Sequence, residues 1–140
     1  MTEPSFGSHH FNIRIYYEDT DAGGVVYHAN YLRFAERART EALRDAGAPH
    51  AELVASHGLM FMVRRVKMDY LAPARLDDRL VVATTTLKLR GASVDLRQSV
   101  LRDGAVLAVL ELQMVCVRCA DGRPDRIPRR WLDVLDAVRA

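Results

Sequence analysis

Residues 11–47 read FNIRIYYEDTDAGGVVYHANYLRFAERARTEALRDAG and change from one hydrophobic period to another. Up to Tyr17, apolar and polar side chains alternate, which is the period of a half-buried strand with Phe11, Ile13, Ile15 and Tyr17 on its inner face. From about His28 the apolar residues recur at helical spacing. They are Tyr31, Phe34, Ala35, Ala38, Ala42, Leu43 and Ala46. Gly47 is placed to end the helix, so the stretch predicts a strand, a tight turn and a long helix.

The chain after this helix returns to a period of two. A short helix is expected within residues 48–58, closed by Gly58, and a strand follows it up to Pro73, which forbids its continuation. On this strand Met60, Met62, Val66, Met68 and Tyr70 are predicted to share one face. Three more strands are predicted at 79–89, 93–102 and 105–117, with a hairpin at Asp103-Gly104.

A final short helix is predicted to begin at Pro128 and to turn Trp131, Leu132, Leu135 and Val138 inward. The order of elements, with one strand, one long helix and then four antiparallel strands, indicates an α+β fold in which the helix lies on a single sheet. Residues 1–140 are expected to form one domain, with 1–10 and 122–140 as peripheral ends. One helix cannot cover both faces of such a sheet, so at least a dimer is expected.

Composition excludes several classes of protein. The chain has 140 residues, is 49% hydrophobic and carries a net charge of only +2, which favours a globular domain and gives no sign of a nucleic-acid-binding surface. Its longest apolar run, AVLAVL at 105–110, is too short to span a membrane. The first ten residues, MTEPSFGSHH, lack the apolar segment of a secretory signal, so a cytoplasmic location is expected.

The two cysteines, Cys116 and Cys119, form a CVRC motif. Zinc needs about four ligands and no second Cys or His pair is suitably spaced, while a redox motif would normally open a helix. We therefore interpret both as structural thiols and expect neither a metal nor a cofactor. His9, His10, His50 and His57 lie in polar or terminal surroundings and are not expected to be catalytic.

Three carboxylates, on Glu18, Asp19 and Asp21, precede the predicted long helix. In one interpretation they are turn and cap residues, because acids favour the first turn of a helix. In the other interpretation they are catalytic. Free N–H groups at a helix start polarise a carbonyl, and a nearby carboxylate then either attacks it or activates the water that attacks it. From these residue types alone, the structural interpretation of Asp21 is the commoner one.

A longer pattern favours the chemical interpretation. Residues 16–44 (YYEDTDAGGVVYHANYLRFAERARTEALR) resemble the opening motif of the hot-dog-fold acyl-CoA thioesterases, specifically the Tol-Pal-associated (YbgC-type) branch of the 4-hydroxybenzoyl-CoA thioesterase family. Residues 61–78 and 89–100 resemble later strands of that family, so the similarity covers roughly 11–120. The resemblance implies a hot-dog fold, in which a five-stranded, mainly antiparallel sheet wraps one long helix.

The resemblance also implies roles for single residues. It makes Asp21 the catalytic carboxylate, as a nucleophile or as a general base, and it places Gly24 and Val25 in the turn into the helix. The backbone N–H near His28 is implied to face the thioester oxygen. The His28 side chain either orients water or the acyl group, or only caps the helix. Tyr27 is expected beside the substrate.

Met60 and Met62 have two interpretations. Methionine adapts to varied apolar ligands, so they are candidates to line an acyl pocket. Ordinary packing against the long helix accounts for the same pattern and is the favoured interpretation.

The expected activity is hydrolysis of a short-chain or aromatic acyl-CoA, or of an acyl group on an acyl carrier protein, by a homodimer or homotetramer without metal. Arginines are expected to hold the nucleotide phosphates. One alternative is a hot-dog dehydratase, which needs a His and an acid facing each other across the groove. Another is a non-catalytic acyl-thioester-binding or envelope-associated interaction protein.

Overall fold

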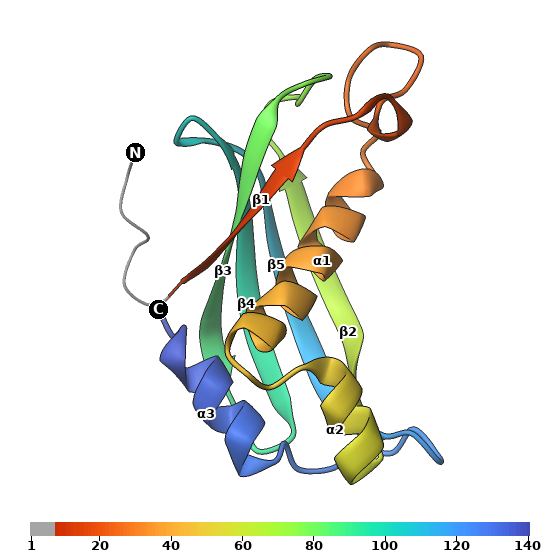
Figure 1. The fold of residues 1–140 in the computed structure, drawn as a ribbon, viewed down its shortest axis with the longest axis vertical. Helices are drawn as coiled ribbons and strands as arrows, with labels where there is room; N and C mark the ends of the chain where they lie inside the picture. The colour runs from red at the N-terminus through yellow and green to blue at the C-terminus, as the bar shows by residue number, and fades with distance from the viewer. Residues whose placement is uncertain (1–7) are drawn as a thin grey trace.

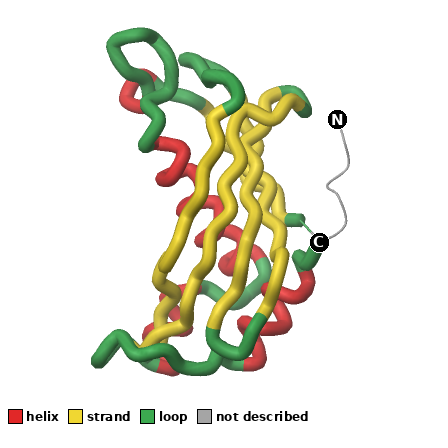
Figure 2. The backbone as a smooth tube through the Cα atoms, turned by 180° about the vertical axis from the view of Figure 1, so that it is seen from behind, coloured by secondary structure: helices red, strands yellow, loops and turns green. Residues whose placement is uncertain are grey.

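The helices of this protein lie on one face of a five-stranded antiparallel sheet (Figure 1). The structure is a computed structural model, and it describes residues 8–140. The strands are β1 (His9–Arg14), β2 (Leu59–Tyr70), β3 (Arg79–Leu89), β4 (Ser93–Arg102) and β5 (Ala105–Arg118), in the spatial order β1-β3-β4-β5-β2. The helices are α1 (Asn30–Asp45), α2 (His50–His57) and α3 (Arg129–Ala137). Seen from behind, the sheet stands in front of the helices (Figure 2). The predicted α+β architecture is confirmed.

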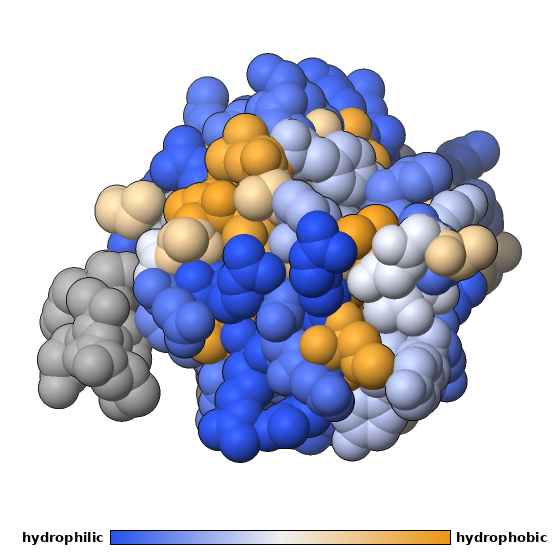
Figure 3. Space-filling model, turned by 90° about the horizontal axis from the view of Figure 1, so that it is seen from above, coloured by the Kyte–Doolittle hydropathy of each residue, from blue (hydrophilic) through white to orange (hydrophobic). Residues whose placement is uncertain are grey.

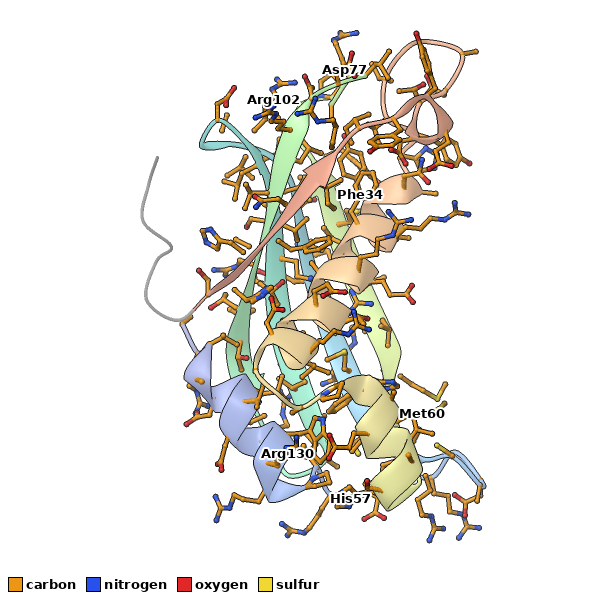
Figure 4. All side chains as sticks on the ribbon, viewed as in Figure 1. Phe34, His57, Met60, Asp77, Arg102 and Arg130 are labelled. Carbon is orange, nitrogen blue, oxygen red and sulfur yellow. The ribbon has the colours of Figure 1, made fainter. Side chains whose placement is uncertain are left out.

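The long helix α1 packs on the sheet through a face of small and aromatic side chains. Phe34, Ala35 and Ala38 are almost completely buried, and Figure 4 shows Phe34 between the helix and the sheet. The side-chain amide of Gln98 on β4 donates a hydrogen bond to the carbonyl of Ala35 at 2.9 Å. A strand side chain reaches the helix backbone here because alanine keeps the two surfaces close.

The first strand is shorter than its hydrophobic pattern predicts. β1 ends at Arg14, and residues 17–19 form a 3-10 turn, η1 (Tyr17–Asp19). The Asp19 carboxylate accepts the Tyr16 N–H at 2.9 Å, which bends the chain away from the sheet. Ile15 is buried as predicted, whereas Tyr17 is 80% exposed, so its predicted inward orientation is wrong.

The predicted apolar face of β2 is also wrong, because a β-bulge lies between Val63 and Arg65. Directly opposed residues in an antiparallel pair share a face. Met62 opposes Val115, whereas Met68 opposes Leu110 in the core. An extra residue changes which side chains face the helix. Met60 and Met62 therefore lie on the face away from α1, and Figure 4 labels Met60 beside α2.

The C-terminal half matches the predicted strands to within one residue, and Asp103-Gly104 forms the expected hairpin with positive φ at both residues. The final helix α3 closes one end of the core. Trp131 is 1% exposed, and its indole N–H donates to the carbonyl of Ala48 at 3.0 Å, in the connection between α1 and α2. Leu135 is buried as predicted, and Leu132 is partly buried.

The connection between β2 and β3 supports the chain before α1. The N–H of Val26 donates to the carbonyl of Ala74 at 2.8 Å. The Asp78 carboxylate closes this connection by accepting the Arg75 N–H at 2.8 Å and Arg102 Nη1 at 2.7 Å. Burial opposes ionisation of Asp78, but these two hydrogen bonds outweigh it and lower the pKa of the carboxyl below its usual value.

Replacing Trp131 by alanine should destabilise the fold strongly. Removing a buried aromatic side chain costs about 3–5 kcal/mol because the cavity left behind collapses only partly. Urea unfolding at neutral pH measures the loss. Arg129→Ala, on the exposed side of the same helix, should change the free energy of unfolding by less than about 0.5 kcal/mol. Equal effects of the two variants would contradict the packing of α3 described above.

Asp78→Asn should remove a pH-dependent part of the stability. Because the folded-state pKa of Asp78 lies below the unfolded-state value, its contribution is complete above the unfolded pKa, near about 4. The contribution is lost as the pH falls through the folded pKa. Urea midpoints across pH 2–7 should therefore show the parent more stable than the variant at neutral pH and the two converging in acid.

The matched control is Asp77→Asn. The Asp77 carboxylate makes no hydrogen bond within residues 8–140, and asparagine tolerates the positive φ of 69° at this position. The role assigned to Asp78 would be contradicted if the difference in urea midpoint between the parent and Asp78→Asn did not narrow in acid. It would also be contradicted if Asp77→Asn showed the same difference.

Candidate active site

A tight loop carries the predicted catalytic carboxylate into the start of α1. Thr20 and Val26 form an isolated antiparallel bridge. Inside it the N–H of Asp21 donates to the carbonyl of Val25 at 2.8 Å, and the N–H of Gly24 donates to the carbonyl of Asp21 at 3.0 Å. Gly24 adopts a φ of +80°, which glycine reaches without strain. The two glycines therefore serve the turn that the sequence predicted.

Asp21 combines a structural contact with an exposed carboxylate. Its Oδ1 accepts the N–H of Gly23 at 2.8 Å, the geometry of an Asx turn. A side chain at position 23 would place its Cβ 3.2 Å from this oxygen. Across residues 8–140 no hydrogen bond reaches Oδ2 of Asp21. The turn interpretation and the chemical interpretation are thus compatible, because one oxygen holds the loop and the other faces solvent.

The start of α1 offers a backbone donor beside this loop. The residue that caps the helix is Ala29, which makes no side-chain capping hydrogen bond. The N–H groups of Asn30 and Tyr31 donate back to the carbonyls of Tyr27 and His28. Within the described part of the chain, the N–H of His28 donates no hydrogen bond. Because the N-terminus of a helix carries a partial positive charge, this N–H suits an oxyanion.

Tyr70, at the end of β2, fixes the peptide that carries this donor. Its hydroxyl donates to the carbonyl of His28 at 3.0 Å. Its ring packs edge-on against the rings of His28 and Tyr31, with centroids 6.1 and 5.5 Å away. Burial and the neighbouring Tyr31 raise the pKa of Tyr70, so the hydroxyl stays protonated and able to donate.

Asn30 joins the other side of the loop to the helix. Its side-chain amide donates to the carbonyl of Asp19 at 2.9 Å, and the same carbonyl accepts the N–H of Tyr27. The sequence analysis assigned no role to Asn30 or to Tyr70. Two features of the sequence could have indicated these residues. Asn30 is a polar residue at the first position of a helix, and Tyr70 is a tyrosine just before a Pro-containing connection.

The predicted site residues fall into two groups. Asp21, Gly24, Val25, Tyr27 and His28 lie together in one loop. Figure 3 looks down on the end of the molecule that carries it, where hydrophobic and hydrophilic side chains alternate. Met60 and Met62 are not brought to this loop within one chain. They begin β2, whereas its end at Tyr70 meets the loop, and ten strand residues span about 33 Å.

The remaining predictions concern thiols, metals and membranes. Burial, with smaller effects of Asp125 and Cys119, raises the pKa of Cys116 to about 11, so this buried thiol is protonated at neutral pH. Residues 8–140 contain no group of three or more His, Cys, Asp or Glu side chains arranged to hold a metal ion. In the same residues no helix has the length and apolar character needed to cross a membrane.

Comparison with known proteins identifies the family. Residues 16–138 match the thioesterase-like superfamily, which extends the similarity through α3. The acyl-CoA thioesterase YbgC of Haemophilus influenzae is 41% identical over 119 residues, which cover 85% of this chain and 88% of that protein. The acyl-CoA thioester hydrolase YbgC of Escherichia coli is 43% identical over 118 residues, which cover 84% of this chain and 87% of that protein.

A solved structure agrees with these sequence matches. A probable thioesterase from Bartonella henselae is 35% identical and superposes with a TM-score of 0.83, covering 86% of this chain and 99% of that one. The hot-dog fold that residues 16–44 predicted is confirmed. By its sequence and by its fold, this chain belongs to the thioesterase-like superfamily.

Proposed function

We propose that this protein hydrolyses acyl-CoA thioesters, with Asp21 as the reacting carboxylate and the N–H of His28 as the oxyanion donor. One observation carries the proposal: an exposed carboxylate and an unused helix-start N–H lie on the same tight loop. The YbgC relatives, named as acyl-CoA thioesterases at 41% and 43% identity, support this choice of substrate. A short-chain or aromatic acyl group, on CoA or on an acyl carrier protein, is part of the proposal.

The chemistry needs an electrophile polarised at oxygen and a group that acts at carbon. The N–H of His28 stabilises negative charge on the thioester oxygen as the carbonyl carbon becomes tetrahedral. Asp21 then acts in one of two ways. As a nucleophile it forms a mixed anhydride and expels the thiolate, and water later cleaves the anhydride. As a general base it takes a proton from the water that attacks the carbonyl carbon.

Tyr70 is assigned a supporting role in this scheme. Its hydrogen bond to the carbonyl of His28 holds the peptide group at the helix start, and its ring limits the movement of the His28 side chain. The cytoplasmic location expected from the first ten residues and the Tol-Pal association that the resemblance implies remain predictions.

Asp21→Asn should abolish hydrolysis while leaving the fold intact. An asparagine amide keeps an oxygen for the N–H of Gly23 but has no negative charge for attack or for proton transfer, which is worth about 10²–10⁴ in rate. The measurement is thiol release, read with a chromogenic thiol reagent, from short-chain, long-chain and aromatic acyl-CoAs. An acyl group on acyl carrier protein completes the panel.

The matched control is Asp19→Asn, which removes a carboxylate two residues away and should change the rate only a few-fold. The oxygen of asparagine still accepts the N–H of Tyr16 that Asp19 accepts. Folded parent and Asp21→Asn proteins that bind acyl-CoA without turnover would favour the non-catalytic binding protein. Equal loss of rate in both variants would contradict the assignment of Asp21.

We also propose that a second copy of the chain covers the free edge of β2. This strand has 12 residues, and within residues 8–140 only one of its edges pairs, with β5. Long exposed edges with apolar side chains are rare in monomers because they promote aggregation. Met62, Val63 and Val66 are each more than two-fifths exposed. A homodimer, alone or paired into a tetramer, would bury them.

Light scattering should give at least twice the 15.8 kDa mass of one chain in dilute neutral buffer. Val66→Asp should reduce that mass, because a charge on this edge opposes pairing. Asp133→Asn on the exposed side of α3 is the control and should leave the mass unchanged. A parent mass equal to one chain would refute the dimer.

A further inference from the structure

A cavity of about 470 Å³ lies at the end of α1 remote from the Asp21 loop. The ends of α1, α2 and α3 gather over the sheet in this region (Figure 1). The walls come from every strand and all three helices, and most of the side chains are apolar, among them Leu43, Leu96, Met114 and Val134. Its volume is within the range typical of small-molecule sites.

Three side chains with ordinary charges border this apolar space: the cation Arg39 and the acids Glu36 and Asp45. Arg39 of α1 lines the cavity and donates one hydrogen bond, from Nη1 to Oε1 of Gln98 at 3.0 Å. A guanidinium has five N–H donors, and no other hydrogen bond from Arg39 occurs within residues 8–140. No carboxylate of the described residues lies within ion-pair distance, although Glu36 is one helical turn away. The pKa of Arg39 is lowered, because the effect of burial exceeds the opposing effect of the nearby Glu36 charge.

The guanidinium is held in a fixed orientation. The amide nitrogen of Gln98 donates to the carbonyl of Ala35 at 2.9 Å and to the hydroxyl of Thr84 at 3.0 Å, which turns its oxygen toward Arg39. Gln98 is completely buried. A fully bonded buried amide resists rotation, so it presents Arg39 to the cavity as a preorganised donor.

Of the other titratable groups that line the cavity, Glu36 is exposed, and Asp45 and the two histidines have partners within the chain. His9 is paired through Nε2 with Asp45 at 2.8 Å, and its buried Nδ1 has no partner within residues 8–140. His50 accepts the N–H of Phe61 through Nε2, and burial lowers its pKa, so it is neutral at pH 7. A cation with unused donors beside an apolar cavity suits a ligand with one negative end and an apolar body.

We propose that this cavity binds a small carboxylic acid with an unbranched apolar chain. The carboxylate accepts hydrogen bonds from the unused N–H groups of Arg39, and the chain lies against Leu43, Leu96 and Met114. Thioester hydrolysis releases acids of this class, but binding at this site does not require that activity. Arg39 is nine residues along α1 from Asn30, about 14 Å from the helix start, so the site is distinct from the Asp21 loop of the same chain.

Calorimetric titration of the full chain with hexanoate, octanoate and 1-octanol tests the proposal. Octanoate should bind, and each added methylene should tighten binding by about fourfold, since burying one CH₂ contributes about 0.8 kcal/mol. The neutral alcohol, with the same chain, should bind at least about tenfold more weakly because it forms no charge-assisted pair with Arg39. Absence of octanoate binding, or equal binding of acid and alcohol, overturns the proposal.

Variants locate the site. Arg39→Gln should weaken octanoate binding at least about tenfold. Arg37→Gln, on the exposed side of the same helix, should change it less than about twofold. A circular-dichroism melt of each variant checks its fold. If Arg39→Gln does not fold, the proposal is tested by the parent protein alone: equal binding of octanoate and 1-octanol overturns it, and tighter binding of octanoate supports it.

A third variant separates this site from the proposed catalytic loop. Asp21→Asn should bind octanoate as the parent does, whether or not either protein hydrolyses acyl-CoA. Loss of octanoate binding in Asp21→Asn, or unchanged binding in folded Arg39→Gln, would place the ligand elsewhere and overturn the assignment of Arg39.

Discussion

The contact between Gln98 and the carbonyl of Ala35 sets the distance between α1 and the sheet. It forms because Ala35 and Ala38 present almost no side-chain bulk to the strands. The same buried amide also bonds Thr84 on β3, so the middle of the helix is tied to two neighbouring strands. The axis of α1 is thereby held relative to two strands, and both ends of the helix acquire defined positions.

The two ends of α1 differ in chemistry because they differ in backbone polarity and in neighbours. At the N-terminal end, N–H groups point toward the Asp21 loop, and Tyr70 holds the His28 peptide. Tyr27 and His28 at that end are exposed. Farther along the helix, Arg39 lines a largely apolar cavity that opens to solvent, and it bonds the neutral amide of Gln98. One helix thus begins beside the proposed catalytic loop and borders a separate cavity farther along.

The β-bulge in β2 decides what each part of that strand contacts. Before the bulge, Met60 and Met62 lie on the outer face of the sheet, and after it Met68 turns toward the core. The end of the strand then delivers Tyr70 to the helix start rather than to the outer face. A strict alternation along the strand would have put all of these side chains on one face, so the extra residue places Met60 and Met62 on the opposite face from Met68 and Tyr70.

The sequence by itself determined the elements and the local motif. The helical spacing of Tyr31 to Leu43, the glycine stops and the Asp103-Gly104 hairpin are read correctly because periodicity and turn chemistry depend on neighbouring residues. The long motif around Asp21 identified the family for the same reason. The alternating pattern did not reveal the early end of β1, where hydrogen bonds among Tyr16, Tyr17, Asp19 and Thr20 form a 3-10 turn instead of continuing the strand.

Only the tertiary structure decided which distant residues meet. Tyr70 and His28 are 42 positions apart, and Arg39 and Gln98 are 59 apart. Their contacts follow from the register of β2 against β5 and from the closeness of α1 to β4, neither of which appears in the order of residues along the chain. Sequence patterns fix local conformation, whereas contacts between distant residues depend on how whole elements pack, and a single bulge changes that packing.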